Sequence, residues 1–362
     1  MKGFTQNELV PSNGDEINNQ VLRKNFYSNA IKTTFHRGAI LPHRSEVTEV
    51  IENSVQSIEL SYSKTTFGKK TWQQTYSYPK VGVSALAIDL GNPKVLGSGF
   101  GVFPFIELPL NHAKINWSFK IGYGLGYIQK PFDREKNYKN VAIGSPINAL
   151  IYANMLGDIK ISSALNTSLG LSLIHFSNGS FARPNLGINI LSVNLGASYS
   201  FGKKEPLIVS KLDKRDHLWS KKFMFGFGLK EIPPAGGPKY WVSSYSFNMM
   251  KIRAEKSSFG FGADVFYNSS LSDLLLRNSS ATSSSIDNFR LGLLAMYSFD
   301  FGKVSVSVGM GGYVISNYKG NGSIYNKLET RYAVNEKIFL RLAMKTHIVV
   351  ADFIETGLGY NF

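Results

Sequence analysis

The chain has 362 residues and no cysteine, which excludes disulfides, thiolate nucleophiles and cysteine-based metal sites. No run of about 18 apolar residues is present, so the sequence predicts no membrane-spanning helix. The net charge of +15 indicates an anionic partner. Because no nucleic-acid motif accompanies the lysines and arginines, we expect no nucleic acid, but either solvated loops or attraction to lipid phosphates.

Residues 1–28 form a polar segment that lacks the apolar core of a signal peptide. From residue 29 onward the dominant pattern is an alternation of apolar and polar residues, which predicts β-strands. In residues 117–127, Trp, Phe, Ile, Tyr and Leu alternate with Ser, Lys and Gly, and residues 223–229 and 304–310 repeat this arrangement. One face of each predicted strand is therefore apolar, and the opposite face is small or polar.

This alternation, together with 25 Phe, 18 Tyr and 34 Gly, is typical of a transmembrane β-barrel. At the roughly 9–11 residues that a spanning strand needs, the segments predict about 14 strands, within a range of about 12 to 16. We therefore expect an all-β chain in which residues 29–362 form a single antiparallel, transmembrane outer-membrane β-barrel. Such a protein must be exported, and we expect that a signal peptide has been removed or was left out of this sequence.

Three further segments of the predicted barrel are a charged connection, an exposed loop and the last strand. Residues 203–222 are a charged connection between two halves of the barrel, and residues 268–287 are an exposed loop rich in Ser and Asn. In the last strand, alternation places every second residue from Asp352 to Phe362 on one face. A terminal aromatic residue on an amphipathic strand resembles the sorting signal of outer-membrane proteins.

One predicted strand ends in residues with catalytic chemistry. A leucine face in residues 169–173 continues into His175 and Ser177, because side chains two residues apart point the same way. The next strand carries Asn189 on its apolar face, and a hairpin that pairs residues 177 and 187 sets His175 opposite Asn189. Three polar groups then meet on the lipid-facing wall, where polar groups are costly.

This constellation suits nucleophilic cleavage of an ester. Ser177 is the candidate nucleophile, His175 is the base that takes its proton, and Asn189 orients the imidazole. The backbone amides of Asn178 and Gly179 are candidate oxyanion donors. The alternative is structural, because His-x-Ser tripeptides are common and these residues also fit a strand end followed by a turn.

The other histidines carry weaker signals. We expect interfacial or solvated positions for all of them: His36, His43, His112, His217 and His347. No cluster of His, Asp and Glu has metal-ligand spacing, so we expect neither a metal nor another cofactor.

The segment from Ile174 to Gly179, followed by Pro184-Asn185-x-Gly187-x-Asn189, resembles the H-x-S-N and P-N-x-G motif of the PagL-type lipid A 3-O-deacylases. These are also known as acyloxyacyl hydrolases, and residues 351–360 resemble the longer members from Bacteroidetes-like bacteria. The resemblance implies an outer-membrane β-barrel esterase that removes an ester-linked acyl chain from lipid A. It assigns His175 as the base, Ser177 as the nucleophile and Asn178 to the oxyanion hole.

Two features depart from the founding enzyme of that family. It carries Glu where this chain has Asn189, although the longer relatives carry Asn and outer-membrane phospholipase A uses a Ser-His-Asn arrangement. The founding barrel has eight strands and this chain is more than twice as long, so the extra strands are expected to widen the lumen, with or without a transport role.

The leading hypothesis is a hydrolase, a serine esterase of the bacterial outer membrane, whose partners are lipid A within lipopolysaccharide and the surrounding outer-membrane lipid. The alternatives are a non-catalytic porin-like barrel or adhesin, which keeps the motif as structure, and a phospholipase A-type esterase. The sequence leaves the oligomeric state and the cleaved acyl position open.

Overall fold

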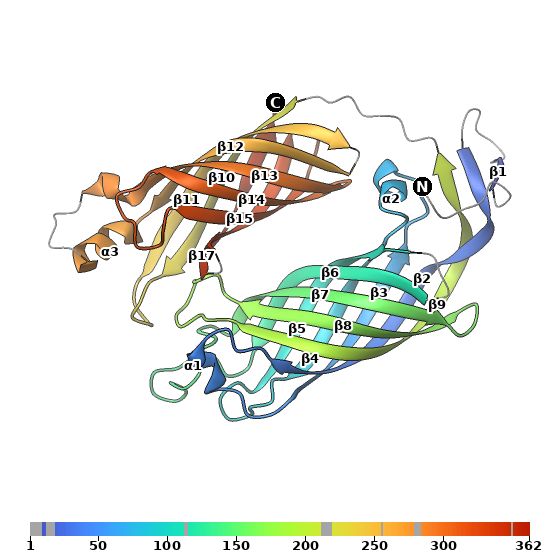
Figure 1. Cartoon of the computed structure of the whole chain (residues 1–362), viewed down its shortest axis with the longest axis horizontal. Helices are drawn as coiled ribbons and strands as arrows, with labels where there is room; N and C mark the ends of the chain where they lie inside the picture. Colours follow the sequence, from blue (N-terminus) through green and yellow to red (C-terminus); the bar gives the residue numbers. More distant parts are fainter. Residues whose placement is uncertain are drawn as a thin grey trace. The chain divides into compact units, whose positions relative to one another are not determined.

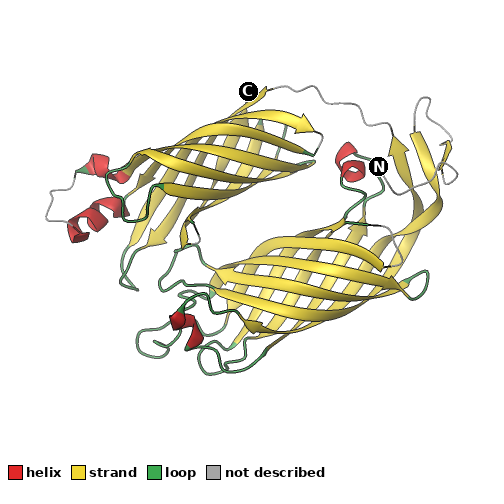
Figure 2. Ribbon diagram, in the orientation of Figure 1, coloured by secondary structure: helices red, strands yellow, loops and turns green. Residues whose placement is uncertain are grey.

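The computed structural model describes residues 9–11, 19–111, 115–210, 219–254, 256–278, 284–348 and 350–362. The chain divides into two compact units, one within residues 1–178 and 184–213 and the other within residues 179–183 and 214–362. Each unit contains a closed barrel of eight antiparallel strands (Figures 1 and 2).

In the first barrel each strand pairs with its neighbours in sequence, and β2 closes the barrel by pairing with β9. A short strand, β1 (Leu9–Pro11), also pairs with β2. Two short helices, α1 (Ser45–Thr48) and α2 (Thr71–Thr75), lie in connections of this unit. The barrel strands are β2 (Asn19–Ile40), β3 (Val55–Thr65), β4 (Lys80–Asp89), β5 (Ser98–Pro109), β6 (Ile115–Ile128), β7 (Ile147–Lys160), β8 (Leu165–Ser177) and β9 (Ile188–Ser210).

The second barrel closes in the same way, through the pairing of β10 with β17. The connection between β12 and β13 contains the helix α3 (Ser270–Asn278) and the 3-10 helix η2 (Ser285–Asn288). No helix in the described part of the chain is long and apolar enough to cross a membrane. The strands are β10 (Trp219–Glu231), β11 (Lys239–Ala254), β12 (Ser257–Asn268), β13 (Phe289–Phe301), β14 (Val304–Ile315), β15 (Ile324–Ala333), β16 (Ile338–His347) and β17 (Val350–Asn361).

The structure contains two barrels where the sequence predicts a single one in residues 29–362. Alternation depends only on the two faces of each strand, so it is the same in one large barrel and in two small ones. Two small barrels differ from one large barrel in the pairs of strands that close them. Here β2 pairs with β9 and β10 pairs with β17, and each pair joins strands that are far apart in the chain. The extra strands therefore form a second barrel instead of widening one lumen, and β2 already begins at Asn19, within the predicted polar segment.

Both barrels carry apolar side chains outside and polar side chains inside. Leu60 and Leu195 on the first barrel and Phe261 on the second are 56%, 61% and 60% exposed. Glu59 and Ser61, which flank Leu60, are only 1% and 3% exposed. An apolar outer wall around a polar interior is the arrangement of a barrel in a lipid bilayer, so the predicted all-β, outer-membrane fold class is confirmed.

Charged groups inside the first barrel include a hydrogen-bonded cluster around Glu59. Its carboxylate accepts from Lys120 and, at 2.8 Å, from the hydroxyl of Tyr152. His36 lies here as well, with Nε2 3.3 Å from the same carboxylate and Nδ1 3.0 Å from the hydroxyl of Ser172. The expectation that His36 is interfacial or solvated is therefore wrong, because its strand position points the ring into the barrel.

The second barrel is filled by ion pairs in the same manner. Arg341 donates from Nε to Glu329 and from Nη2 to Glu355, both at 2.6 Å, and from Nη1 to Ser244 at 3.2 Å. All three charged residues are at most 2% exposed. Because an eight-stranded barrel is just wide enough for its side chains, these pairs occupy the interior.

Asp352 points into the barrel, although alternation predicts it on the same face as Leu358 and Tyr360, which are exposed. The pairing of β16 with β17 shifts register there, since Thr346 pairs with Ala351 while Lys345 pairs with Phe353. The extra residue is a β-bulge, which reverses the alternation locally. Its carboxylate accepts from Lys345 at 2.7 Å and from a second lysine, Lys230.

Both predicted connections contain regular structure. Residues 203–210 continue β9 and β10 begins at Trp219, while residues 211–218 lie outside the described part of the chain. Residues 270–278 of the Ser-rich segment form α3, and the Arg277 guanidinium donates to the carbonyl of Pro233 at 2.5 Å.

We expect Arg341→Ala to unfold at a lower urea concentration than the parent protein. The change leaves the carboxylates of Glu329 and Glu355 buried without their shared cation, which costs roughly 3–5 kcal/mol. Tryptophan fluorescence during urea unfolding in micelles measures this loss. Lys337→Ala, in an exposed turn of the same barrel, is the control, and equal midpoints for the two variants would contradict the role of Arg341.

Candidate active site

The three candidate catalytic side chains come from two neighbouring strands of the first barrel. Strands β8 and β9 pair antiparallel, and His175 lies opposite Asn189, as the sequence predicts. The β8–β9 ladder ends one step later, and Ser177 is the last residue of β8. The site is therefore positioned by strand register at the loop end of the hairpin.

The site belongs to the outer wall of the barrel. The leucines that precede it on the same face are 43–65% exposed: Leu169, Leu171 and Leu173. The side chains of His175 and Asn189 are half-buried, and Ser177 is 6% exposed. A polar constellation thus stands at the end of an apolar face, which is the placement that the alternation predicts.

Hydrogen bonds connect the three side chains in one line. The Nδ1 atom of His175 lies 2.7 Å from Oδ1 of Asn189, and its Nε2 atom lies 3.0 Å from the hydroxyl oxygen of Ser177. Because an amide oxygen only accepts, Nδ1 carries the imidazole proton. Nε2 is then the acceptor for the Ser177 hydroxyl proton, which is the arrangement that a general base requires.

Gly187 allows the loop after β8 to return close to the imidazole. Its φ of +84° lies in the left-handed region, and a Cβ atom there would stand 3.0 Å from Cε1 of His175. Its N–H donates to the carbonyl of Ala142 at 2.9 Å. A side chain at this position would press on the imidazole ring of His175.

The two predicted oxyanion donors differ in their surroundings. The backbone N–H of Asn178 donates to Oδ1 of Asn185 at 3.0 Å, so in this conformation it holds the loop instead of facing a substrate. Gly179 has a φ of +61°, and a Cβ atom there would lie 2.4 Å from Cγ1 of Ile354. The N–H of Gly179 remains the predicted backbone donor for an oxyanion.

Residues 179–183 pack within the second compact unit. The Ser180 hydroxyl donates to the carbonyl of Ala351 at 2.7 Å, and the Ser180 carbonyl accepts from the N–H of Glu231 at 2.8 Å. These two bonds hold Ser180 at a φ of +67°, an unusual conformation for a residue with a side chain. The backbone that follows Asn178 is thereby fixed on strands β17 and β10.

One residue for which the sequence predicts no catalytic role contacts this group of side chains. His43 is exposed, yet its Nδ1 lies 3.1 Å from Nδ2 of Asn189 and its Nε2 lies 2.9 Å from the carbonyl oxygen of Leu186. No local pattern signals this contact, because 146 residues separate His43 from Asn189. The expectation that His43 is merely interfacial or solvated is incomplete for that reason.

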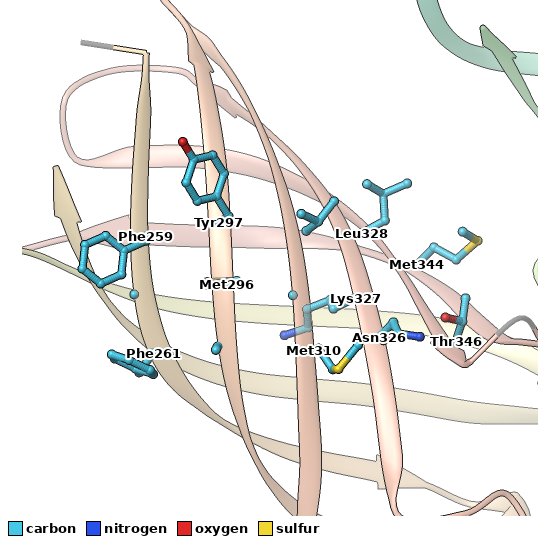
Figure 3. Close-up of a pocket in the computed structure, with 14 residues that line it drawn as sticks. Phe259, Phe261, Met296, Tyr297, Met310, Asn326, Lys327, Leu328, Met344 and Thr346 are labelled. Atoms are coloured by element: carbon cyan, nitrogen blue, oxygen red, sulfur yellow. The ribbon is translucent and has the colours of Figure 1, made fainter. Parts of the chain in front are cut away.

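A separate apolar groove of about 720 Å³ lies on the second barrel (Figure 3). Its lining includes Phe259, Phe261, Met310, Leu328 and Met344, but neither serine nor histidine. The groove therefore lacks a serine–histidine pair like that of the first barrel. Within the described ranges, no group of three or more His, Asp and Glu side chains is arranged to hold a metal ion.

Two closed barrels with apolar outer walls define an outer-membrane β-barrel protein, and the Ser177–His175–Asn189 line gives it a candidate serine esterase site. Residues 56–198 match the family described as lipid A 3-O-deacylase (PagL), and residues 219–362 match the acyloxyacyl hydrolase C-terminal domain. These two matches cover most of the chain, which belongs to the PagL and acyloxyacyl hydrolase family. The predicted resemblance is confirmed.

No curated protein matches the sequence significantly. Among solved structures, a Rhodopseudomonas blastica porin triple mutant is similar at 8% identity over 93% of this chain and 100% of its own, with a TM-score of 0.18. Acinetobacter baumannii Omp33 matches at 9% identity over 93% and 97%, with a TM-score of 0.17. The siderophore receptor PirA from Pseudomonas aeruginosa matches at 10% identity over 95% and 86%, with a TM-score of 0.21. Likeness at this level carries no information on function.

Replacing Asn185 tests whether the hydrogen bond that holds the loop at Asn178 supports the reactivity of Ser177. Asn185→Leu removes the oxygen that accepts from the Asn178 N–H, and we expect the rate at which a fluorophosphonate labels Ser177 to fall roughly fivefold, since one hydrogen bond is worth about 1 kcal/mol. Asn185→Asp keeps an acceptor oxygen and should label within about twofold of the parent. Equal losses in both variants would show that this bond does not support the site.

Proposed function

We propose that this protein is a serine esterase of the Gram-negative outer membrane that removes an ester-linked acyl chain from lipid A. The observation that carries the proposal is the hydrogen-bonded line of Ser177, His175 and Asn189 on the outer wall of a barrel. Membership of the PagL and acyloxyacyl hydrolase family supports lipid A as the substrate. The family description also points to the 3-O position as the bond that is cut.

In the first half of the reaction, the Ser177 hydroxyl oxygen attacks the carbonyl carbon of the ester. Nε2 of His175 takes the hydroxyl proton, and Oδ1 of Asn189 holds the Nδ1–H of the imidazolium that forms. The tetrahedral intermediate places a negative charge on the former carbonyl oxygen, and we assign its stabilisation to the Gly179 N–H. His175 then returns the proton to the departing sugar hydroxyl, which leaves an acyl group on Ser177.

In the second half, water replaces the sugar hydroxyl. His175 removes a proton from the water as its oxygen attacks the acyl carbonyl, and the second tetrahedral intermediate that forms collapses with cleavage of the bond to Ser177 and release of a fatty acid. The proton returns to the Ser177 oxygen, so the enzyme ends in its starting state.

The position of the site supports a substrate that stays in the membrane. Ser177 and His175 stand at the loop end of an apolar face, where the acyl esters of a lipid meet its head group. A lipid beside the barrel reaches this wall with its chains along the exposed leucines of β8. The net charge of +15 further favours a lipid that carries phosphates.

Two alternatives predict different products. A phospholipase A-type esterase would use the same three side chains but would release fatty acid from phosphatidylethanolamine. A porin-like barrel without catalysis would conduct ions in planar bilayers and release no acyl chain. The filled interiors of two eight-stranded barrels disfavour a wide pore.

Ser177→Ala and His175→Ala each test the proposal. We expect either change to lower acyl release from lipid A by at least roughly 10³-fold, because the nucleophile and the base act as a unit. Mass spectrometry of lipid A from cells that express each variant measures the loss of one acyl chain. Heat-modifiable migration on gels should be unchanged, which separates loss of chemistry from loss of folding.

Ser200→Ala, on β9 and far from the site along the strand, is the matched control and should deacylate like the parent protein. Unchanged lipid A in cells that express the parent chain, or full activity of Ser177→Ala, would refute the proposal. Fatty acid released only from phosphatidylethanolamine would replace lipid A deacylation with the phospholipase alternative.

A further inference from the structure

His43 is placed against the catalytic line by both backbone and side-chain contacts. It follows β2 by three residues, and the N–H of Leu41 donates to the carbonyl of Asn189 at 2.7 Å. The imidazole of His43 then lies between two partners on the β8–β9 hairpin: the Leu186 carbonyl, 2.9 Å from Nε2, and the Asn189 side chain, 3.1 Å from Nδ1.

The Leu186 carbonyl determines which atoms donate in the hydrogen bonds between His43 and Asn189 and between Asn189 and His175. A carbonyl only accepts, so Nε2 of His43 carries the proton and Nδ1 of the neutral ring is an acceptor. Only the NH₂ group of Asn189 satisfies that acceptor, and its oxygen must then face His175. A backbone carbonyl thus determines, through two side chains, that Nδ1 of His175 is protonated.

This direction matters because an amide has two unlike ends. With its NH₂ group turned toward His175, Asn189 would donate to Nδ1, and the proton of the imidazole would move to Nε2. An Nε2–H cannot accept the proton of Ser177, so that tautomer is inactive as a base. A carboxylate at this position has two equivalent oxygens and would need no such selection.

We propose that His43 is a positioning residue that holds the Asn189 amide oxygen toward His175 and thereby selects the active tautomer of the base. The inference rests on the proposed roles of Ser177 and His175 in ester cleavage. The hydrogen bonds of His43 join it to Asn189 and to the Leu186 carbonyl and not to the nucleophile or the base, so it orients the base through Asn189.

The test combines His43→Ala with Asn189→Asp in the full-length protein reconstituted in micelles. With Asn189 present, His43→Ala should lower kcat for lipid A deacylation roughly tenfold and change KM less than about twofold, as expected for one selecting hydrogen bond. In the Asn189→Asp background, His43→Ala should change kcat by less than about twofold, because a carboxylate has no orientation to select.

Arg44→Ala, the exposed neighbour of His43, is the control and should keep the parent kcat in both backgrounds. If His43 only holds the β8–β9 loop, His43→Ala should lower kcat by the same factor of about ten whether residue 189 is Asn or Asp. That outcome overturns the proposal.

A spectroscopic measurement separates this inference from the proposed function. In protein labelled with ¹⁵N-histidine, the His175 ring should be an Nδ1–H tautomer in the parent and should gain Nε2–H population in His43→Ala. An unchanged tautomer in that variant refutes the positioning role. Because the measurement needs no substrate, an inactive parent protein with the expected tautomer change would refute lipid A deacylation and leave the positioning role standing.

Discussion

The closure of each set of strands into a barrel is the constraint on which the site depends. Closure pairs the backbone groups of the edge strands and leaves each side chain only two directions, outward or inward. His175 and Ser177 share the outward direction because they are two residues apart, and the β8–β9 register brings Asn189 beside them. A slip of one residue would set His175 opposite an inward side chain, so the hydrogen-bonded line of Ser177, His175 and Asn189 follows from register.

The same constraint explains the interiors. Side chains that point inward in an eight-stranded barrel have room only for one another, so charged residues there must be paired. Glu59 with Lys120 in the first barrel and Arg341 with two glutamates in the second meet this requirement. The second barrel repeats the architecture of the first without enlarging its lumen, which makes the additional strands an added unit and not a wider channel.

Sequence alternation predicted what depends on neighbouring residues. It placed His175 opposite Asn189 and set the apolar faces outward, because both follow from a period of two and a short hairpin. It did not predict two barrels, since the closing pair of each barrel joins strands far apart in the chain. It also missed the inward turn of Asp352, which a bulge causes, and the contact of His43 with Asn189, which depends on the return of β2 beside β9.

The amide at position 189 is best understood from its place on the outer wall. A carboxylate there would stabilise the imidazolium of His175, but it would also set a negative charge against an apolar face at the edge of a bilayer, where charge is costly. The amide of Asn189 avoids that cost. Unlike a carboxylate, however, it has no negative charge to stabilise the imidazolium and only one oxygen that can accept from it. A further contact must then orient the Asn189 amide. In our proposal His43 makes this contact, and the Leu186 carbonyl orients His43. The base of this site therefore depends on a loop that follows β2, not only on the hairpin that carries the motif.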